Sequence, residues 1–361
     1  MLKTIFFFLL STQLFCGQII RDTIFGKPKF VKENVVFLTE IKSYKFLSTD
    51  GDYGHATIMN PEDLRKSMRD SWFGSAFCRY INNETYFDKN RNIINEKWFY
   101  NSGKLVGDYR YSYDRFSRLV FKSDSSDYAM IKSKMFYQSR DINPIFKETI
   151  RYKKDGTTQK HSRFLDTFPE KQISEYDVVN KVENVYLVTN KKNKIVSDEG
   201  AYQEIRDSVF NRYLIMQRYY NDQWQISKSV KFYTDYKNFT KKSNKFYTYE
   251  YDELNRKIKE SKYENDRLIT SSLYKYNPQD YLIERKTFVN DRLLYSEKYS
   301  YENNYIVKLE INDNFGNESN QDLNKIVTFK YKFDKQKNWT EITKIVDGKN
   351  LYVWKREIEY Y

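Results

Sequence analysis

Residues that cross-link a fold or bend it sharply are scarce in this chain. Its 361 residues include 11 glycines, 5 prolines and 2 cysteines. So few cysteines exclude a disulfide framework and a four-cysteine metal site. The glycines form no phosphate-cradling loop, no dinucleotide fingerprint and no Gly-x-Ser-x-Gly turn. The sequence is therefore poorly equipped for several common kinds of enzyme chemistry.

Histidine is equally scarce. His55 and His161 are far apart, and no His-x-x-x-His spacing is present, so we expect no metal and no cofactor. Cys78 lies in the apolar run "SAFCRY" and is interpreted as a buried small residue. Residues 50–57, "DGDYGHAT", are the one polar cluster that resembles a site. The favoured interpretation of these residues is a polar loop before a helix.

Long hydrophobic runs are absent except at the start, "MLKTIFFFLLSTQLFCG". Lys3, the apolar run 5–10 and a small-residue end predict a signal peptide over residues 1–17. A buried first strand is the alternative, and lipidation at Cys16 is disfavoured because bulky residues precede it. We expect an exported protein, periplasmic or associated with the cell envelope or secreted, and not an integral membrane protein. After cleavage one cysteine remains, which excludes an intramolecular disulfide.

The chain carries a formal net charge of +13, but its cations are not gathered into a track. Lysine alternates with acidic residues, as in "RKIKESKYENDR", which is typical of a solvated strand face. We therefore expect no nucleic-acid partner. Attraction to anionic envelope polymers or lipid head groups remains reasonable.

What the chain has in abundance is aromatic side chains, with 34 tyrosines and 26 phenylalanines. Such residues favour the pleated, half-buried surface of a sheet. The stretch 249–268, "YEYDELNRKIKESKYENDRL", is followed 25 residues later by "YKYNPQDYLIERKTFVNDRL" at 274–293. A fixed interval of this kind predicts one β-hairpin per copy.

Each predicted unit has an aromatic opening, a turn, a strand and a tight Asn-Asp reversal that tolerates positive φ. In the unit that opens at Tyr247, the second strand spans residues 256–263. The repeat positions are Phe87, Asp88, Tyr111, Tyr113, Asp114, Asp252, Asn265, Asp266, Asn290, Asp291, Tyr331, Phe333 and Asp334. Residues 101–103 predict a further hairpin turn, and "YYNDQW" at 219–224 predicts another Asn-Asp reversal.

The motifs "YSYDRFSRL" and "YEYDELNRKI" resemble the YD repeat of Rhs-type bacterial surface and toxin-delivery proteins, most clearly over 86–120 and 247–361. In place of the family's turn glycine stand Ser117, Asn255 or Asp280, and Asn and Asp still adopt the left-handed region. The chain has no Asp-Pro core motif and no toxin domain. It is similar instead to short exported YD-repeat proteins of the Bacteroidetes type, a resemblance that supplies no biochemical role.

Outside the repeat, Asn60 as N-cap, Pro61 and two acidic residues predict a helix over 60–70. Residues 197–210 indicate a second helix, weakened by Gly200. Residues 153–158 predict a hairpin turn. Because no flexible linker is visible, we expect one elongated domain over 18–361. Its predicted fold is all-β, an array of antiparallel hairpins in an extended or curled meander, with one or two short helices.

We expect a non-enzymatic envelope protein, a scaffold or a binder of a polymer or another protein. The alternatives are an envelope carbohydrate-binding protein and a glycan-active enzyme, whose paired carboxylates leave no local signature. Candidate ligand-binding residues are Tyr249, Tyr251, Tyr274, Tyr276, Tyr299 and Tyr301. Cross-strand packing explains these tyrosines equally well, and Trp98, Trp224, Trp339 and Trp354 are interpreted as strand packing residues. The final "EIEYY" is a candidate edge strand that could capture a peptide.

Overall fold

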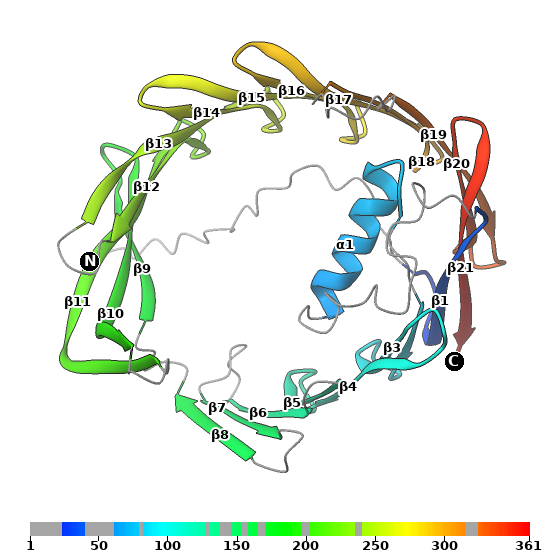
Figure 1. The fold of residues 1–361 in the computed structure, drawn as a ribbon, viewed down its shortest axis with the longest axis horizontal. Helices are drawn as coiled ribbons and strands as arrows, with labels where there is room; N and C mark the ends of the chain where they lie inside the picture. Colours follow the sequence, from blue (N-terminus) through cyan, green and yellow to red (C-terminus); the bar gives the residue numbers. More distant parts are fainter. Residues whose placement is uncertain are drawn as a thin grey trace, which may run out of the picture.

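The computed structural model describes residues 24–39, 61–78, 82–126, 130–137, 146–152, 158–164, 170–196, 202–234, 240–314 and 324–361. These residues form one curled antiparallel sheet of 21 strands, with a helix on its concave side (Figure 1). The predicted array of antiparallel hairpins is therefore confirmed.

The first half of the array contains β1 (Pro28–Phe37), β2 (Asn82–Phe87), β3 (Ile93–Phe99), β4 (Leu105–Tyr113), β5 (Leu119–Ser126), β6 (Met130–Phe136), β7 (Phe146–Tyr152), β8 (Thr158–Phe164), β9 (Glu170–Asp177), β10 (Val182–Val196) and β11 (Tyr202–Tyr220). The second half contains β12 (Ile226–Thr234), β13 (Thr240–Tyr251), β14 (Lys257–Glu264), β15 (Arg267–Tyr276), β16 (Leu282–Val289), β17 (Arg292–Glu302), β18 (Tyr305–Asp313), β19 (Lys325–Phe333), β20 (Trp339–Val346) and β21 (Lys349–Tyr360). The helix α1 spans Pro61–Gly74.

Strands adjacent in the chain are adjacent in the sheet except β8 and β9, and one further pairing joins the two ends of the chain. β1 lies between β2 and β21 and is antiparallel to both. The prediction that the final "EIEYY" forms an edge is therefore wrong, because Ile358 pairs with Val31 of β1. Among the described residues, the ladders of the array end instead at β8 and β9.

Two kinds of turn connect the strands. Two-residue turns such as Asn265–Asp266 place both residues at positive φ, 50° and 61°. Five-residue turns other than 100–104 begin with Asp or Asn, whose side chain accepts hydrogen bonds from the backbone of the turn. In the turn 252–256, Asp252 Oδ1 accepts from the N–H groups of Leu254 and Arg256, at 3.0 and 2.9 Å. The Asp of the repeat is therefore a turn former.

The residues that replace the family's turn glycine lie in the left-handed region. Ser117, Asn255 and Asp280 have φ of 58°, 65° and 65°. Five-residue turns that begin with Asp or Asn occur at 88–92, 114–118, 221–225, 252–256, 277–281 and 334–338. Because neighbouring strands alternate in direction, these turns lie on one rim of the sheet together with residues 24–27, 177–181, 303–304 and Tyr361. We call this edge the turn rim; the tight turns 265–266, 290–291 and 347–348 lie on the opposite rim.

Two local predictions are wrong. Residues 202–210 of the predicted second helix belong to the strand β11. They are extended because they pair with β10, where Val196 is opposite Tyr202 and Ile195 is opposite Gln203. The segment 219–224 is not a two-residue Asn-Asp reversal. Asn221 opens a five-residue turn there, and Trp224 takes the positive φ of 58°.

The helix predicted from Pro61 is confirmed, and it packs into the concave face. Trp72 is fully buried between Tyr352 and Trp354 of β21, with ring centroids 6.4 and 5.3 Å away. Cys78 follows the helix and is fully buried, and burial raises the pKa of its thiol to about 12. Its interpretation as a buried small residue is confirmed.

Several predictions fall outside the described residues: the signal peptide 1–17, the polar cluster 50–57 with His55, and the turn residues 153–157. The strands β7 and β8 that flank this turn pair up to Tyr152 and Thr158. Among the described residues, no helix is both long and apolar enough to cross a membrane.

Candidate functional site

One tyrosine in each of five openings makes the same contact along the array: it is the second tyrosine in four of them, and it is Tyr331, the first aromatic residue, in the fifth. Its hydroxyl donates to a backbone carbonyl at the start of a strand that precedes it in the chain. The pairs are Tyr113 to Ile93 (3.0 Å), Tyr251 to Ile226 (2.9 Å), Tyr276 to Lys257 (2.9 Å), Tyr301 to Leu282 (2.7 Å) and Tyr331 to Ile306 (2.8 Å). We call this series the hydroxyl ladder. The tyrosine hydroxyls that a sugar could otherwise contact are therefore engaged in hydrogen bonds within the sheet.

The first tyrosines of the openings are also engaged within the sheet. Lys257 Nζ lies 5.8 Å from the ring centroid of Tyr249 and 5.1 Å from that of Tyr274. Burial raises the pKa of the Tyr249 hydroxyl to about 12. Tyr299 is 4% exposed, and its hydroxyl donates to Glu297 Oε2 at 2.9 Å. The concave face thus carries cations and carboxylates among its tyrosines.

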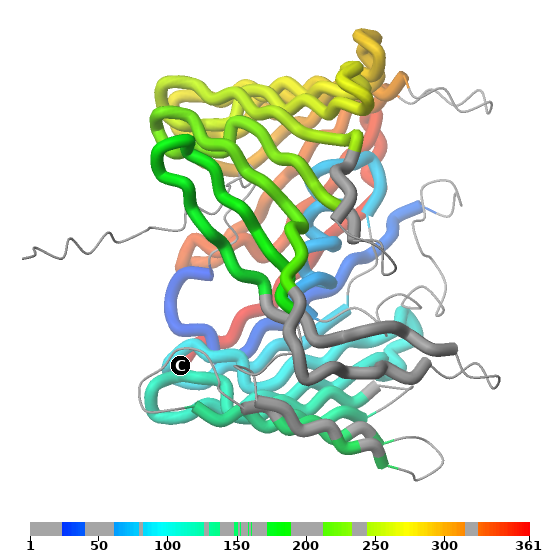
Figure 2. Tube along the Cα trace, turned by 90° about the vertical axis from the view of Figure 1, so that its left-hand side faces the viewer, coloured from blue at the N-terminus to red at the C-terminus, as the bar shows by residue number. Residues whose placement is uncertain are grey.

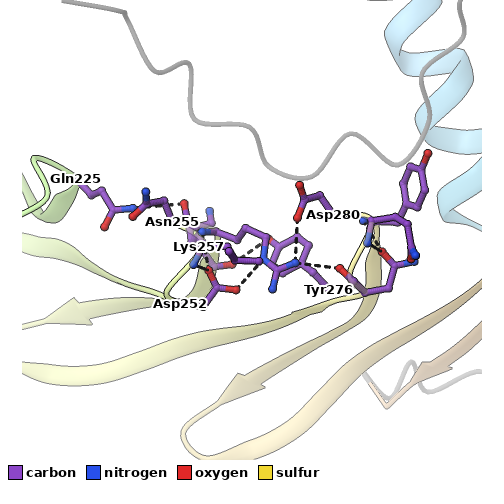
Figure 3. A network of polar contacts seen from close by, with 11 residues as sticks. Gln225, Asp252, Asn255, Lys257, Tyr276 and Asp280 are labelled. Atoms are coloured by element: carbon purple, nitrogen blue, oxygen red, sulfur yellow. Dashed lines mark hydrogen bonds and ion pairs between the residues drawn. The ribbon is translucent and has the colours of Figure 1, made fainter.

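Successive turns of the turn rim are tied to one another, as Figure 3 shows for three of them. Gln225 Nε2 donates to the carbonyl of Asn255 at 3.3 Å. Arg256 bonds Asp252 within its own turn at 2.7 Å and Asp280 of the next turn at 3.0 Å. Side chains therefore hold the spacing between repeats as well as the shape of each turn.

The most polar cluster on the concave face centres on Glu183 of β10, which is 2% exposed. Its carboxylate accepts from Ser174 Oγ at 2.6 Å, Tyr176 Oη at 3.2 Å, Tyr220 Oη at 2.6 Å and Arg218 Nη1 at 2.9 Å. Burial pushes the pKa of Glu183 upward, but the hydrogen bonds outweigh it and hold this pKa below its ordinary value. A carboxylate kept ionised in this way suits ligand or partner positioning better than proton donation.

Two further buried carboxylates have similar partners. Glu297 of β17 is 1% exposed and accepts from Tyr295 at 2.6 Å and from Tyr299, with Arg285 Nε 2.9 Å away. Glu96 of β3 is also 1% exposed and pairs with Arg65 of α1. Burial raises the pKa of Glu96, and Arg65 opposes this shift.

The strand register places Glu183 on the same face as the candidate tyrosines. Glu183 pairs with Arg218, Arg218 with Ser229, and Ser229 with Tyr247. Tyr247 alternates onto the same face as Tyr249 of its strand. No group of three or more His, Cys, Asp and Glu side chains that could hold a metal occurs among the described residues.

Sequence reasoning missed these carboxylate clusters. Their members lie on different strands, and the register that joins them is not visible in a local motif. Of the predicted packing tryptophans, Trp98, Trp339 and Trp354 are buried on strands, whereas Trp224 lies in a turn and is 44% exposed. His161 lies in β8.

No family model and no curated protein sequence matches the chain. Similar solved structures include TcdB2-TccC3-TEV (13% identity, TM-score 0.24) and the Photorhabdus luminescens Tc holotoxin pore (11% identity, TM-score 0.25). Each alignment covers 76% of this chain and 19% of that chain, so this chain spans about a fifth of their length. A porin-like protein from Bacteroides uniformis aligns over 92% of this chain and 98% of its own, at 10% identity and a TM-score of 0.18. Function is therefore argued from the chain's own residues.

Proposed function

We propose that this chain is a YD-repeat protein of the short exported type, which serves as a non-enzymatic scaffold of the cell envelope. The observation that carries the proposal is the hydroxyl ladder. Five tyrosine hydroxyls bond backbone carbonyls, and the Asp or Asn of each five-residue turn bonds its own backbone. The repeat motif is thereby explained by structure, with no ligand required.

A scaffold must hold other protein segments in place, and the sheet already holds the helix α1. Its concave face carries α1 through the ion pair between Arg65 and Glu96 and through the burial of Trp72. The same curled face extends beyond the helix along β9 to β17. This extension would receive a protein or polymer partner.

Carbohydrate binding is the second candidate, favoured by the Glu183 cluster. Tyr176 is 50% exposed and Arg218 is 34% exposed at the side chain, so an aromatic ring lies beside a charged donor. Rings with nearby polar groups are common in pockets that recognise small polar ligands.

Thermal-shift measurements on the protein from residue 18 onward, against cell-wall fragments and envelope polysaccharides, separate the two candidates. A ligand selective for the folded state raises the melting temperature by mass action. The scaffold proposal expects no shift with any glycan. It also expects Tyr276→Phe, which removes one member of the hydroxyl ladder, to lower the melting temperature.

A reproducible shift with one glycan that is lost in Tyr176→Ala and kept in Tyr276→Phe would replace the scaffold with a carbohydrate-binding protein. Fractionation of cells tests export independently. Recovery of the chain in the cytoplasm would contradict the envelope assignment.

A further inference from the structure

The turns of the turn rim are aligned with one another along one edge of the sheet. Figure 2 shows its turns aligned at the left of the view, from the yellow and green hairpins down to the C-terminus. Side chains lock neighbouring turns together. Asn338 Nδ2 donates to the carbonyl of Phe25 at 3.0 Å, Arg91 donates to that of Ile24 at 2.8 Å, and Asn92 Nδ2 lies 3.4 Å from Ser117 Oγ.

Large apolar side chains project from this rim. The exposed fractions are 52% for Phe25, 48% for Phe116, 65% for Val178, 90% for Val179, 44% for Trp224, 64% for Leu254 and 51% for Tyr361. They come from six separate segments around the array. The tight turns of the opposite rim carry Asn265–Asp266, Asn290–Asp291 and Asp347–Gly348 instead. The opposite rim also exposes Leu38, Leu105 and Ile326, at 51%, 41% and 51%, but these lie at the ends of strands and not within its turns.

Positive charge gathers in the sector of the rim where the two ends of the chain meet. Its exposed cations are Lys27, Lys89, Arg91, Arg115, Lys335 and Lys337. The acidic residues of its turns are Asp88, Asp114 and Asp334, which are partly buried and accept hydrogen bonds from their own turns. The outward charge of this sector is therefore positive, whereas the exposed acidic residues of the turn rim lie in its other sectors, at Asp177, Asp222, Glu253, Asp280 and Glu302.

We propose that the turn rim rests flat on an anionic lipid bilayer. The apolar tips would enter the interface between head groups and acyl chains, and the basic sector would contact the lipid phosphates. A planar ring of shallow apolar tips matches an extended flat surface better than it matches a groove. Lipid binding at the turn rim goes beyond the scaffold proposal, because the sheet could act as a scaffold without contacting lipid.

The first test measures partition of the mature protein onto sedimented vesicles. One set is pure phosphatidylcholine, and the other is an equal mixture of phosphatidylcholine and phosphatidylglycerol. We expect binding to the mixed vesicles and much weaker binding to the neutral ones. Each cation near an anionic surface contributes about 1 kcal/mol, or roughly fivefold in partition. The double variant Lys89→Gln/Lys335→Gln should therefore lose binding about 30-fold.

The matched control is Lys298→Gln/Lys355→Gln, which removes two exposed cations from the middle of β17 and β21. It has the same net charge as the rim variant, and we expect less than about a threefold loss. Equal losses in the two variants would show a general charge effect and overturn the proposal. Equal binding to neutral and anionic vesicles would also overturn it.

The second test reports where the protein touches the bilayer. Trp224 is 44% exposed, whereas the other four tryptophans are at most 6% exposed. Lipids brominated on their acyl chains should therefore quench the Trp224 component of the fluorescence, and Trp224→Phe should abolish that quenching while vesicle binding is largely kept. Binding without quenching in the wild type would show that another face contacts the bilayer, and the proposal would be wrong.

Discussion

Replacement of Lys344 by Met tests how the sheet holds its helix. Lys344 lies in β20 and is fully buried. Its Nζ donates to the backbone carbonyls of Ser71 at 3.2 Å, Trp72 at 2.7 Å and Phe77. The ammonium therefore caps the carboxyl end of α1, where carbonyls have no partner within the helix.

Lys344→Met keeps most of the side-chain volume and removes the amino group that bonds the three carbonyls. A buried polar group left without a partner costs about 1 to 3 kcal/mol. Some carbonyls retain other contacts, so we expect a loss of about 3 kcal/mol in the free energy of unfolding rather than the sum. At roughly 2 °C per kcal/mol for a large domain, the melting temperature should fall by about 6 °C.

The loss should depend on pH, because burial lowers the pKa of Lys344 to about 7, from an ordinary value of 10.5. Between these two values the unfolded chain binds the proton and the folded chain releases it. The contribution of Lys344 to the free energy of unfolding therefore rises with pH, by at most about 1.4 kcal/mol per pH unit. The deficit of Lys344→Met against the wild type should be larger at pH 9 than at pH 7.

Denaturant unfolding of both proteins from pH 6.5 to 9.5 measures this deficit. Lys330→Met, which removes an exposed lysine from the neighbouring strand β19, serves as the control and should show little change. A deficit that stays constant with pH would show that the three carbonyls keep Lys344 charged throughout. A deficit no larger than that of the control would refute the capping role itself.

Three further substitutions test other parts of the array by thermal melts. Tyr276→Phe leaves the carbonyl of Lys257 without its hydroxyl donor and should cost about 1 kcal/mol. Asn255→Val should cost about 1 to 2 kcal/mol because valine resists positive φ, whereas Asn255→Gly should be tolerated; equal effects would refute the turn argument. Glu33→Ala removes the carboxylate that lies 2.8 Å from Arg356, which is 4% exposed, and should cost about 3 kcal/mol or more.

The fold was predictable where the information is local. Tyrosine alternation predicted the hairpins, and the Asn-Asp pairs predicted reversals whose φ values are positive at Asn290 and Asp291, 46° and 64°. The helix at Pro61 followed from its cap and first-turn acids. Each of these signals lies within a few residues of the structure that it determines.

Features that depend on distant strands were not predictable. The pairing of β1 with β21 joins segments more than 300 residues apart, and neither strand carries a sequence motif that identifies the other as its partner. The Glu183 cluster joins three strands, with Glu183 on β10 and its donors on β9 and β11, and the β10–β11 register shifts between Val185 and Tyr186. Residues 202–210 resembled a helix in sequence, but the long strand β10 supplied the partner that decided their conformation.

The insertion of β1 between β21 and β2 also sets the relative direction of the two strands at the ends of the array. Every neighbouring pair is antiparallel, and an odd total of 21 strands therefore gives its first and last members the same direction. Those members are β9 and β8, which follow one another in the chain. A short connection joins antiparallel neighbours readily, whereas parallel neighbours need a long crossover. An antiparallel ladder between β8 and β9 is thus excluded by the one strand added at the opposite side of the curl.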